Sequence, residues 1–267
     1  MSVRHARRLL ALSAALFLIA SSAFAQAQTK PFEPTVGQAG KDVVWVPTPQ
    51  SLVERMLDLA KLTPQDFLMD LGSGDGRTVI TAAKRGATAQ GIEYNPDMVA
   101  LSQRNAKEAG VTAKATFVKA DLFETDFSKA QVVTMFLLPS INLRLRPKIL
   151  EMKPGTRIVA NTFTMDDWTP DETSSVTEDC TSWCTALLWI VPAKVEGTWA
   201  VPQGALTLTQ KFQMVTGTLG STPIADGRLR GDEITFTAGG AKYTGKVNGN
   251  TMSGTNGSGA KWSATRK

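Results

Sequence analysis

The chain has 267 residues, with 29 Lys and Arg against 24 Asp and Glu, and a formal net charge of +5. Its one histidine is His5, near the amino terminus. If a segment containing His5 is removed, no Ser-His-Asp triad, Cys-His pair or His-ligated metal site can form in the mature protein. We therefore expect no resident metal. We also expect no nucleic-acid partner, because such proteins carry a concentrated basic stripe.

Residues 1–25 have the three parts of a secretory signal peptide. A basic start with Arg7 and Arg8 precedes an apolar stretch that is too short for a comfortable membrane span, and small residues follow up to Ala25. We expect cleavage and a periplasmic or exported protein. Retention of the segment as an anchor would also leave the folded part outside, close to the inner membrane. A twin-arginine signal, which exports folded proteins, is an alternative, although the "LLA" that follows matches it poorly.

Residues 26–43 are interpreted as a linker, and residues 44–193 as an α/β domain. In this domain helical patterns alternate with short apolar runs. The pattern predicts helices at 51–62, 77–86, 96–110 and 141–152, and strands at 67–71, 89–94, 115–121, 132–138 and 156–163. The alternation predicts a doubly wound parallel sheet covered on both faces. Such a sheet binds its ligand at the carboxyl ends of the strands.

Two cysteines, Cys180 and Cys184, lie in "CTSWC" near the end of this domain. A zinc site needs about four ligands, and a thioredoxin-type pair has two intervening residues instead of three. In an oxidising compartment we expect one local disulfide, and we favour it over a redox role.

Residues 194–267 consist of short runs with a period of two, separated by turn signals such as Asn248-Gly249. Two stretches that start at Gly227 and Gly245, "GRLRGDEIT" and "GKVNGNTMS", match in residue type, and each predicts one hairpin. We expect a small all-β domain, either a sheet or a partial barrel. Its nine basic and four acidic residues indicate either a simple solvated surface or docking to a substrate or an anionic surface.

The stretch "FLMDLGSGDGRTV" takes an apolar strand through a glycine-rich turn into a helix. This arrangement offers backbone N–H groups and the positive end of a helix to a ligand. The predicted cofactor-binding residues of the turn are Asp70, Gly72, Ser73, Gly74, Asp75 and Gly76. The glycine spacing differs from the G-x-G-x-x-G fingerprint of dinucleotide-binding proteins.

Three acidic residues end successive predicted strands. Glu93, at the end of the second strand, suits ribose hydroxyls. Asp121, at the end of the third, is placed to accept from an adenine amino group, with Leu122 or Phe123 against the ring. Asp70 suits a cationic group better than a pyrophosphate. A cofactor that fits all three acids is S-adenosylmethionine. The alternative for Glu93 and Asp121 is a purely structural role, in which they cap the helices that follow.

The motifs "DLGSGDGR", "GIE" and "ADLF" resemble class I S-adenosylmethionine-dependent methyltransferases. More narrowly, "VPTPQSLVERML", "DLGSGDGRTVITAAKRGATAQGIEYNP" and "FTMDDWTPD" are similar to the family that contains the mitochondrial lysine methyltransferases of the ATP synthase c-subunit and the adenine nucleotide translocase. The resemblance covers about residues 44–193. It implies a Rossmann-like sheet of seven strands and transfer of a methyl group to a protein lysine. It also implies that the stretch with Thr48 approaches the cofactor, the alternative being an amino-terminal brace.

The loop after the fourth predicted strand reads "FLLPS" and lacks the polar residue that many amine-methylating relatives carry there. We hypothesise that Leu138 and Pro139 line an apolar slot for a lysine stem, and that no side chain is an obligatory base. Positioning would then supply most of the catalysis. The alternative is that both residues are buried packing. Trp168 lies either near the substrate or in the core, and Trp199 and Trp262 are expected in the core of the β domain.

The sequence leaves one functional alternative from another class. An exported protein with this fold could keep a nucleoside-type pocket as a non-catalytic binding or scaffold protein. The intact glycine loop and its three acids argue against decay of the pocket, but they do not establish turnover. The methyl acceptor and the oligomeric state do not follow from the sequence.

Overall fold

The computed structural model describes residues 32–202 and 204–267. The segment expected to be a signal peptide, 1–25, lies outside the described residues. The elements below all belong to one compact unit, Pro34–Lys267. Among the residues described, no helix combines the length and the apolar character needed to cross a membrane.

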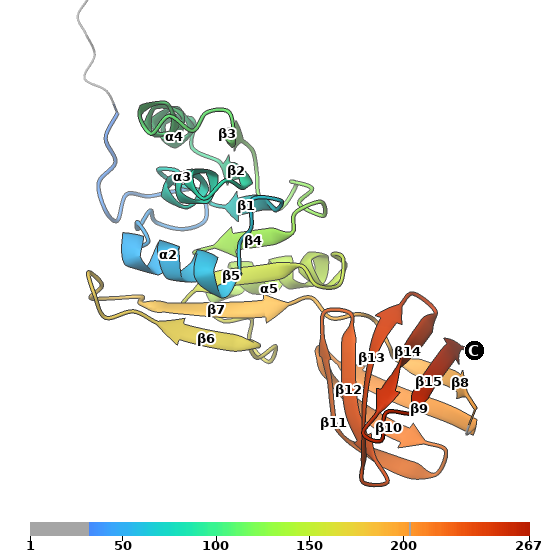
Figure 1. Ribbon diagram of the computed structural model, residues 1–267. Helices are drawn as coiled ribbons and strands as arrows, with labels where there is room; N and C mark the ends of the chain where they lie inside the picture. Colours follow the sequence, from blue (N-terminus) through green and yellow to red (C-terminus); the bar gives the residue numbers. More distant parts are fainter. Residues whose placement is uncertain (1–31, 203) are drawn as a thin grey trace, which may run out of the picture. The chain divides into compact units, whose positions relative to one another are not determined.

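A mixed sheet of seven strands forms the first half of this unit (Figure 1). Its order is β3-β2-β1-β4-β5-β7-β6. The strands are β1 (Phe67–Leu71), β2 (Thr88–Glu93), β3 (Ala115–Lys119), β4 (Val132–Met135), β5 (Arg157–Asn161), β6 (Glu172–Ser175) and β7 (Thr185–Ile190). The first five run parallel, whereas β7 pairs antiparallel with both β5 and β6. The five strands that the sequence pattern predicted are thus parallel, and the antiparallel β7 was not among them.

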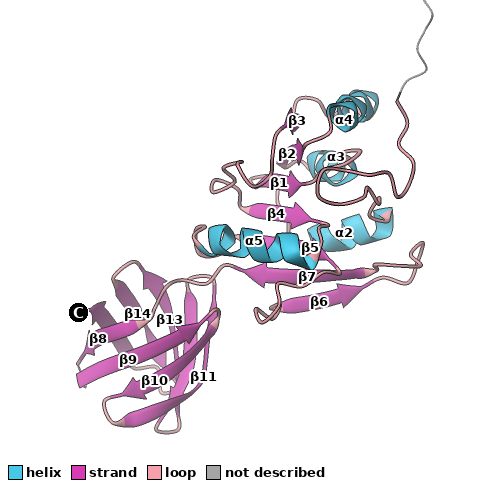
Figure 2. Ribbon diagram, turned by 180° about the vertical axis from the view of Figure 1, so that it is seen from behind, coloured by secondary structure: helices cyan, strands magenta, loops and turns pink. Residues whose placement is uncertain are grey.

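Helices cover both faces of the sheet, as the doubly wound prediction requires. They are α2 (Gln50–Leu59), α3 (Arg77–Lys84), α4 (Pro96–Glu108) and α5 (Pro139–Leu150). Helices α2, α3 and α4 pack on one face around Leu68 and Val132. Helix α5 packs on the other face (Figure 2). Phe127 and Trp168 complete the core on that face. The carboxyl ends of the parallel strands lie at one edge of the sheet, between the helices on its two faces.

Local signals explain where the helices begin. Asn95 caps α4 by accepting a hydrogen bond from the Asp97 N–H, and Pro96 occupies the first turn, where no amide hydrogen is needed. Helix α3 begins directly after Gly76, whose φ of 84° turns the chain out of the glycine loop. This short strand–turn–helix connection sets the end of β1 beside the start of α3.

The second half of the unit is a closed barrel of eight antiparallel strands, in the order β10-β11-β12-β13-β14-β15-β8-β9. The strands are β8 (Gly197–Val201), β9 (Gly204–Lys211), β10 (Met214–Leu219), β11 (Thr222–Arg230), β12 (Glu233–Ala238), β13 (Ala241–Asn248), β14 (Thr251–Asn256) and β15 (Lys261–Arg266). Closure goes beyond the predicted sheet or partial barrel. The two repeats form the β11–β12 and β13–β14 hairpins, as expected.

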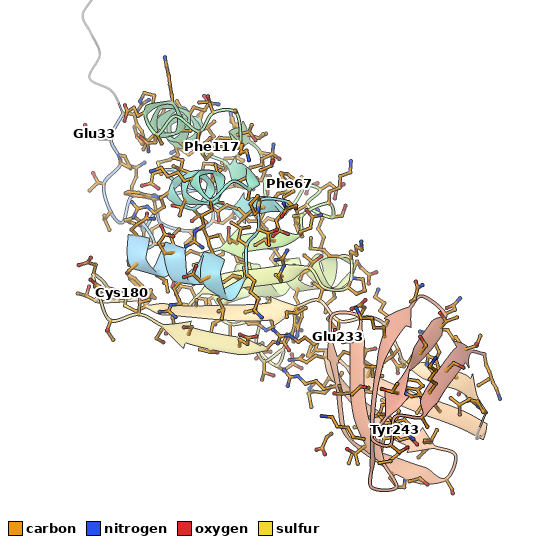
Figure 3. All side chains as sticks on the ribbon, in the orientation of Figure 1. Glu33, Phe67, Phe117, Cys180, Glu233 and Tyr243 are labelled. Carbon is orange, nitrogen blue, oxygen red and sulfur yellow. A yellow bond between two sulfur atoms is a disulfide. The ribbon has the colours of Figure 1, made fainter. Side chains whose placement is uncertain are left out.

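Aromatic residues fill much of the barrel core. Trp199 is fully buried and Trp262 is 7% exposed, which confirms the core role expected for both. Phe236 stacks on Tyr243 at 4.8 Å between ring centroids, and Tyr243 is labelled in Figure 3. The barrel interior is therefore packed by large side chains.

Trp168 resolves one of the alternatives left open by the sequence. Its side chain is fully buried and stacks on Phe212, which lies between β9 and β10, with 5.6 Å between centroids. Its backbone carbonyl accepts a hydrogen bond from Trp189 Nε1 at 2.7 Å. Trp168 therefore belongs to the core, and its contact with Phe212 joins the sheet to the barrel.

Candidate functional site

The glycine loop joins β1 to α3 and forms one wall of a cavity of about 220 Å³. The N–H groups of Gly72 and Ser73 donate to the Ile92 carbonyl, which ties the loop to β2. Gly74 has a φ of 53°, and a Cβ there would lie 2.6 Å from Trp45 Nε1. Both the backbone and the close indole therefore require glycine at this position.

Three carboxylates reach the cavity from successive strand ends, as the sequence predicted. Asp70 lies on β1 and Glu93 ends β2, while Asp121 follows β3. Asp70 pairs in register with Gly91 on one side and Thr134 on the other. The parallel register thus brings these acids to the same edge of the sheet.

Asp70 is the most perturbed of these acids. Its side chain is buried, accepts a hydrogen bond from Thr134 Oγ1 at 2.7 Å, and carries no cationic partner among the described residues. Burial raises the pKa of Asp70 to about 7. The hydrogen bond from Thr134 lowers this pKa, and the nearby negative charges of Asp75 and Glu93 raise it further. A cationic ligand group would restore the charged form.

Glu93 is held in place by the backbone of the site. One oxygen accepts from the Gly74 N–H at 3.0 Å, and the other accepts from the Asn95 N–H at 2.9 Å. Glu93 does not cap helix α4, because the side chain of Asn95 does so. Glu93 therefore links the glycine loop to the end of β2 while it lines the cavity.

Asp121 forms an ion pair with Lys41 and accepts a hydrogen bond from the Phe123 N–H at 2.9 Å. The Lys41 ammonium holds the pKa of Asp121 below its usual range, and Asp121 in turn raises the pKa of Lys41. The Lys41 ammonium also lies 4.8 Å from the centre of the Tyr94 ring. The next element after Asp121 is strand β4, so Asp121 does not cap a helix. Leu122, beside it, lines the cavity.

Residues 38–48 form a further wall of the cavity, and the first six of them, 38–43, were expected to belong to a linker. Backbone hydrogen bonds between Gln38 and Trp45, and between Gly37 and Trp45, fold this segment on itself. Thr48 lines the cavity, and its carbonyl accepts a hydrogen bond from Arg77, which is also paired with Asp75. The segment is thereby fastened to the glycine loop.

The remaining predicted residues divide by position. Ser73 lines the cavity, and its buried Oγ has no hydrogen-bond partner in the described part of the chain. Leu138 lines the cavity as well, whereas Pro139 is the first residue of α5 and is not among the described lining residues. Gly76 is not among them either, because it packs against Phe117 and Ser102. Its role in the structure is to admit that close packing.

Aromatic side chains complete the lining. Phe136 and Phe163, which follow β4 and β5, line the cavity together with Trp183 from the loop between β6 and β7. No pattern in the sequence marks these three residues, because the folded sheet is what brings the three loops together. The disulfide expected between Cys180 and Cys184 is present and closes the loop around Trp183. Within the described ranges, no cluster of three or more His, Cys, Asp or Glu residues has the arrangement of a metal site.

Comparison with known proteins relates this site to methyltransferases. Residues 70–172 match the family model described as the ANTKMT methyltransferase domain. A protein-lysine N-methyltransferase from Saccharolobus islandicus is 44% identical over 152 residues, which are 56% of this chain and 94% of the relative. The human lysine N-methyltransferase of the ATP synthase c-subunit is 38% identical over 48% of this chain. The alignment spans only 54% of that human protein.

A solved structure gives the same picture of the fold. It is described as an RNA methyltransferase from Salinibacter ruber in complex with S-adenosyl-L-homocysteine. It is 47% identical, covers 56% of this chain and 96% of its own, and superimposes with a TM-score of 0.53. The matched part of this chain therefore shares its fold with a protein that was solved with the product form of S-adenosylmethionine.

Proposed function

This chain belongs to the protein-lysine N-methyltransferase family related to the ANTKMT methyltransferase domain, and we propose that it methylates the side-chain amine of a protein lysine with S-adenosylmethionine. The observation that carries the proposal is the cavity at the carboxyl ends of β1, β2 and β3, where the glycine loop meets three carboxylates. The named lysine methyltransferases among its relatives support the acceptor, whereas the name of the Salinibacter ruber relative gives RNA as the alternative.

The residues of the cavity fit this cofactor. Asp70 is a buried carboxylate that has no cationic partner in residues 32–202 and 204–267, which suits the ammonium of an amino-acid tail. The Oγ of Ser73, unpartnered within the same ranges, offers a further polar contact. Glu93 suits the ribose hydroxyls, and Asp121 with Leu122 suits the adenine. When bound, S-adenosylmethionine supplies an electrophilic methyl group on a sulfonium. The protein's task is then to hold an amine in line with that methyl group.

The acceptor side of the cavity is apolar. Leu138 lines it from the loop after β4, beside Leu137 and Ile141. In this environment a lysine ammonium is poorly solvated, which lowers its pKa and favours the neutral, nucleophilic amine. Leu138 packs the lysine stem, and Pro139 fixes the direction in which α5 leaves the site. The loop after β4 supplies no side-chain base, so the proton passes to solvent.

Export of the protein is a second part of the proposal. The pattern of residues 1–25 supports a cleaved signal, and the Cys180–Cys184 disulfide supports an oxidising compartment. The substrate is then a protein of the cell envelope. We expect the protein recovered from a periplasmic fraction to begin shortly after Ala25 or Ala27, as measured by intact mass. Recovery of the full-length chain from the cytosol alone would contradict export.

A methyl-transfer assay tests the proposed reaction. The mature protein is incubated with methyl-tritiated S-adenosylmethionine and either poly-L-lysine or total RNA. We expect label in methylated lysine after acid hydrolysis of the polypeptide, and loss of that label in Asp70→Asn. Label in RNA alone would mean that RNA, and not a protein lysine, is the methyl acceptor. Saturable cofactor binding without transfer to either would identify a binding protein.

A further inference from the structure

The loop between β6 and β7, residues 176–184, holds a partly exposed tryptophan at the cavity. Trp183 lines the cavity while 44% of its surface remains exposed. Its φ of 56° lies in the left-handed region, which a bulky side chain seldom adopts. Strain of this kind persists only where the surrounding structure imposes it, and it gathers at functional sites.

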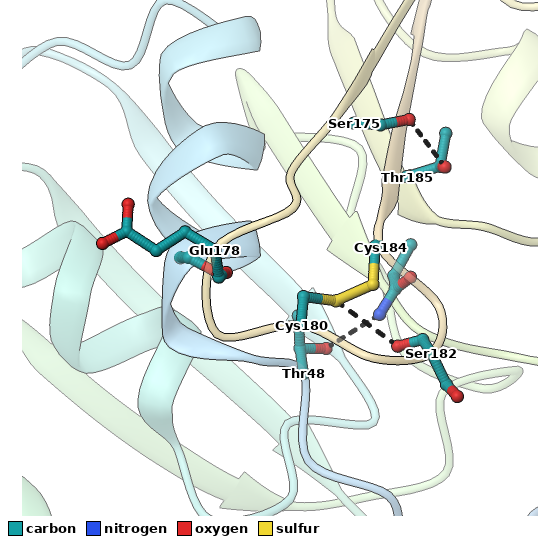
Figure 4. The surroundings of a disulfide bond; sticks show 9 residues. Thr48, Ser175, Glu178, Cys180, Ser182, Cys184 and Thr185 are labelled. Atoms are coloured by element: carbon teal, nitrogen blue, oxygen red, sulfur yellow. Dashed lines mark hydrogen bonds between the residues drawn. A yellow bond between two sulfur atoms is a disulfide. The ribbon is translucent and has the colours of Figure 1, made fainter.

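The loop is fastened at three points, one of which is the disulfide drawn in Figure 4. The Cys180–Cys184 disulfide closes the chain on both sides of Trp183. The Val176 N–H donates to the Cys184 carbonyl at 2.9 Å, and Ser51 Oγ of α2 donates to the Glu178 carbonyl at 2.8 Å. The indole is therefore positioned by its backbone and the disulfide instead of by burial.

Trp183 continues a row of aromatic rings. Its ring centroid lies 6.0 Å from that of Phe136 at an interplanar angle of 58°. Phe136 in turn stacks on Phe163 with 5.9 Å between centroids and an angle of 16°. We name Phe136, Phe163 and Trp183 the aromatic wall. All three line the same cavity as Asp70, and they come from three different loops.

We propose that the aromatic wall is part of the acceptor subsite, where it binds the aliphatic stem of the target lysine and the cationic head of its methylated forms, and that the disulfide loop positions Trp183 for this contact. The proposal rests on the proposed lysine methyltransferase function. It adds these rings to the apolar acceptor side that Leu138 lines and leaves the carboxylates to the cofactor.

The chemistry of the wall favours such a ligand. Ring faces attract a cation through their quadrupole, and the attraction strengthens as water is excluded. Methyl groups weaken the hydration of an ammonium, so a trimethylated lysine pays less to leave water than an unmethylated one. The wall itself contains no charged atom, which prevents a fixed ion pair that would hold the product. It can therefore accept successive methylation states of one lysine.

Ligand binding to the cofactor-saturated protein tests this assignment without requiring turnover. The probe is Nα-acetyl-Nε,Nε,Nε-trimethyllysine amide, followed by saturation-transfer NMR in the presence of S-adenosylhomocysteine. The matched probe without the cation is Nα-acetyl-norleucine amide. We expect Trp183→Ala to weaken binding of the trimethyllysine probe about tenfold, and Trp183→Phe to restore most of it. Binding of the norleucine probe should change much less.

The Cys180→Ser, Cys184→Ser double variant separates the ring from its support. It retains Trp183, yet we expect weaker binding of the trimethyllysine probe, because the loop no longer fixes the indole. Affinity for S-adenosylhomocysteine should stay within about twofold of the wild-type value in Trp183→Ala, Trp183→Phe and the double cysteine variant, since these changes lie outside the proposed cofactor contacts. Equal binding of both probes, or unchanged binding in Trp183→Ala, would overturn the subsite.

Kinetics distinguish failure of this inference from failure of the proposed function. With poly-L-lysine as acceptor, Trp183→Ala should raise KM about tenfold and change kcat less. If lysine is methylated and the KM of Trp183→Ala is unchanged, the result supports the proposed function and contradicts the subsite. If the trimethyllysine probe binds in a Trp183-dependent way but no lysine is methylated, the result supports the subsite and contradicts the proposed function.

Discussion

Asp70 is kept in a buried position that destabilises its charged form in the ligand-free protein. Its folded-state pKa of about 7 lies above the ordinary value of 3.8, so the folded state holds a proton more tightly than the unfolded state does. Stability therefore falls as the pH rises through this window, and the loss is complete above about pH 7. The cofactor's ammonium offsets this cost when it binds.

Replacement of Asp70 separates stability from binding. At about pH 8, Asp70→Asn should raise the melting temperature of the ligand-free protein by about 3 °C or more, because a buried charge is removed. The same variant should lose measurable binding of S-adenosylhomocysteine. Differential scanning calorimetry and titration of the two proteins side by side check both effects. A variant that melts lower and still binds the cofactor would contradict the assignment of Asp70.

The same carboxyl predicts a pH dependence of cofactor affinity. Above about pH 8 Asp70 is already ionised, so affinity should be constant. Below about pH 7 a proton must leave before the ammonium can pair, and affinity should fall towards tenfold for each pH unit. Calorimetric titrations of S-adenosylhomocysteine from about pH 5.5 to 8.5 measure this. A flat profile would show that Asp70 is not the partner of the cationic tail.

Among the elements, residues 38–46 of the segment 38–48 form a part of the site that the sequence did not reveal, whereas Thr48 was implied by the family resemblance. These residues have no hydrophobic periodicity, and Lys41 pairs with Asp121, which lies far along the chain. The glycine loop and the three acids were predictable because each lies at a strand end with a recognisable pattern. The aromatic wall was not, since Phe136, Phe163 and Trp183 meet only after the strands pair.

Strands show the same division between local and tertiary signals. Strand β6 reads "ETSS", has no apolar alternation and lies at the sheet edge, so composition gives no signal for it. Strand β11 contains Pro223, Asp226 with a φ of 53°, and a register shift against both neighbours. Closure of the barrel through β15 and β8 rests on pairing across the whole domain.

Trp45 tests the role of the segment 38–48. Its indole lies against Gly74 and lines the cavity, so Trp45→Ala should remove one wall and weaken binding of S-adenosylhomocysteine about tenfold. Val36→Ala, at a residue that is 63% exposed and not among the described lining residues, is the matched control and should bind as the wild type does. Equal affinities of the two variants, measured by calorimetry, would assign the segment a purely structural role.

For the molecule as a whole, ion pairs of unequal burial join the sheet to the barrel. Arg228 of β11 pairs with Asp171 at 2.6 Å, and the Asp171 side chain is fully buried. Arg230 on the same strand pairs with Glu172, where both side chains are about 40% exposed. Gln213 adds a hydrogen bond from Nε2 to the Thr169 carbonyl at 2.8 Å. The two halves are thus joined by specific polar contacts near the edge strand β6.

The unequal burial of these pairs predicts unequal costs. Arg228→Ala leaves the Asp171 charge buried and should lower the free energy of unfolding by about 2 kcal/mol, or the melting temperature by about 4–8 °C. Arg230→Ala should cost less than about 1 kcal/mol, because its pair is screened by solvent. Thermal unfolding of both variants measures the contrast. Equal losses would mean that the Arg228–Asp171 contact does not secure the barrel to the sheet.

Binding of the cofactor is the claim on which both the function and the acceptor subsite depend, and one calorimetric titration tests it. S-adenosylmethionine and S-adenosylhomocysteine are titrated into the mature protein and into Gly74→Arg, which places a side chain where Trp45 already lies 2.6 Å away from a Cβ. We predict saturable binding of both ligands to the wild-type protein and none to the folded variant. Absence of binding to well-folded wild-type protein would contradict the account.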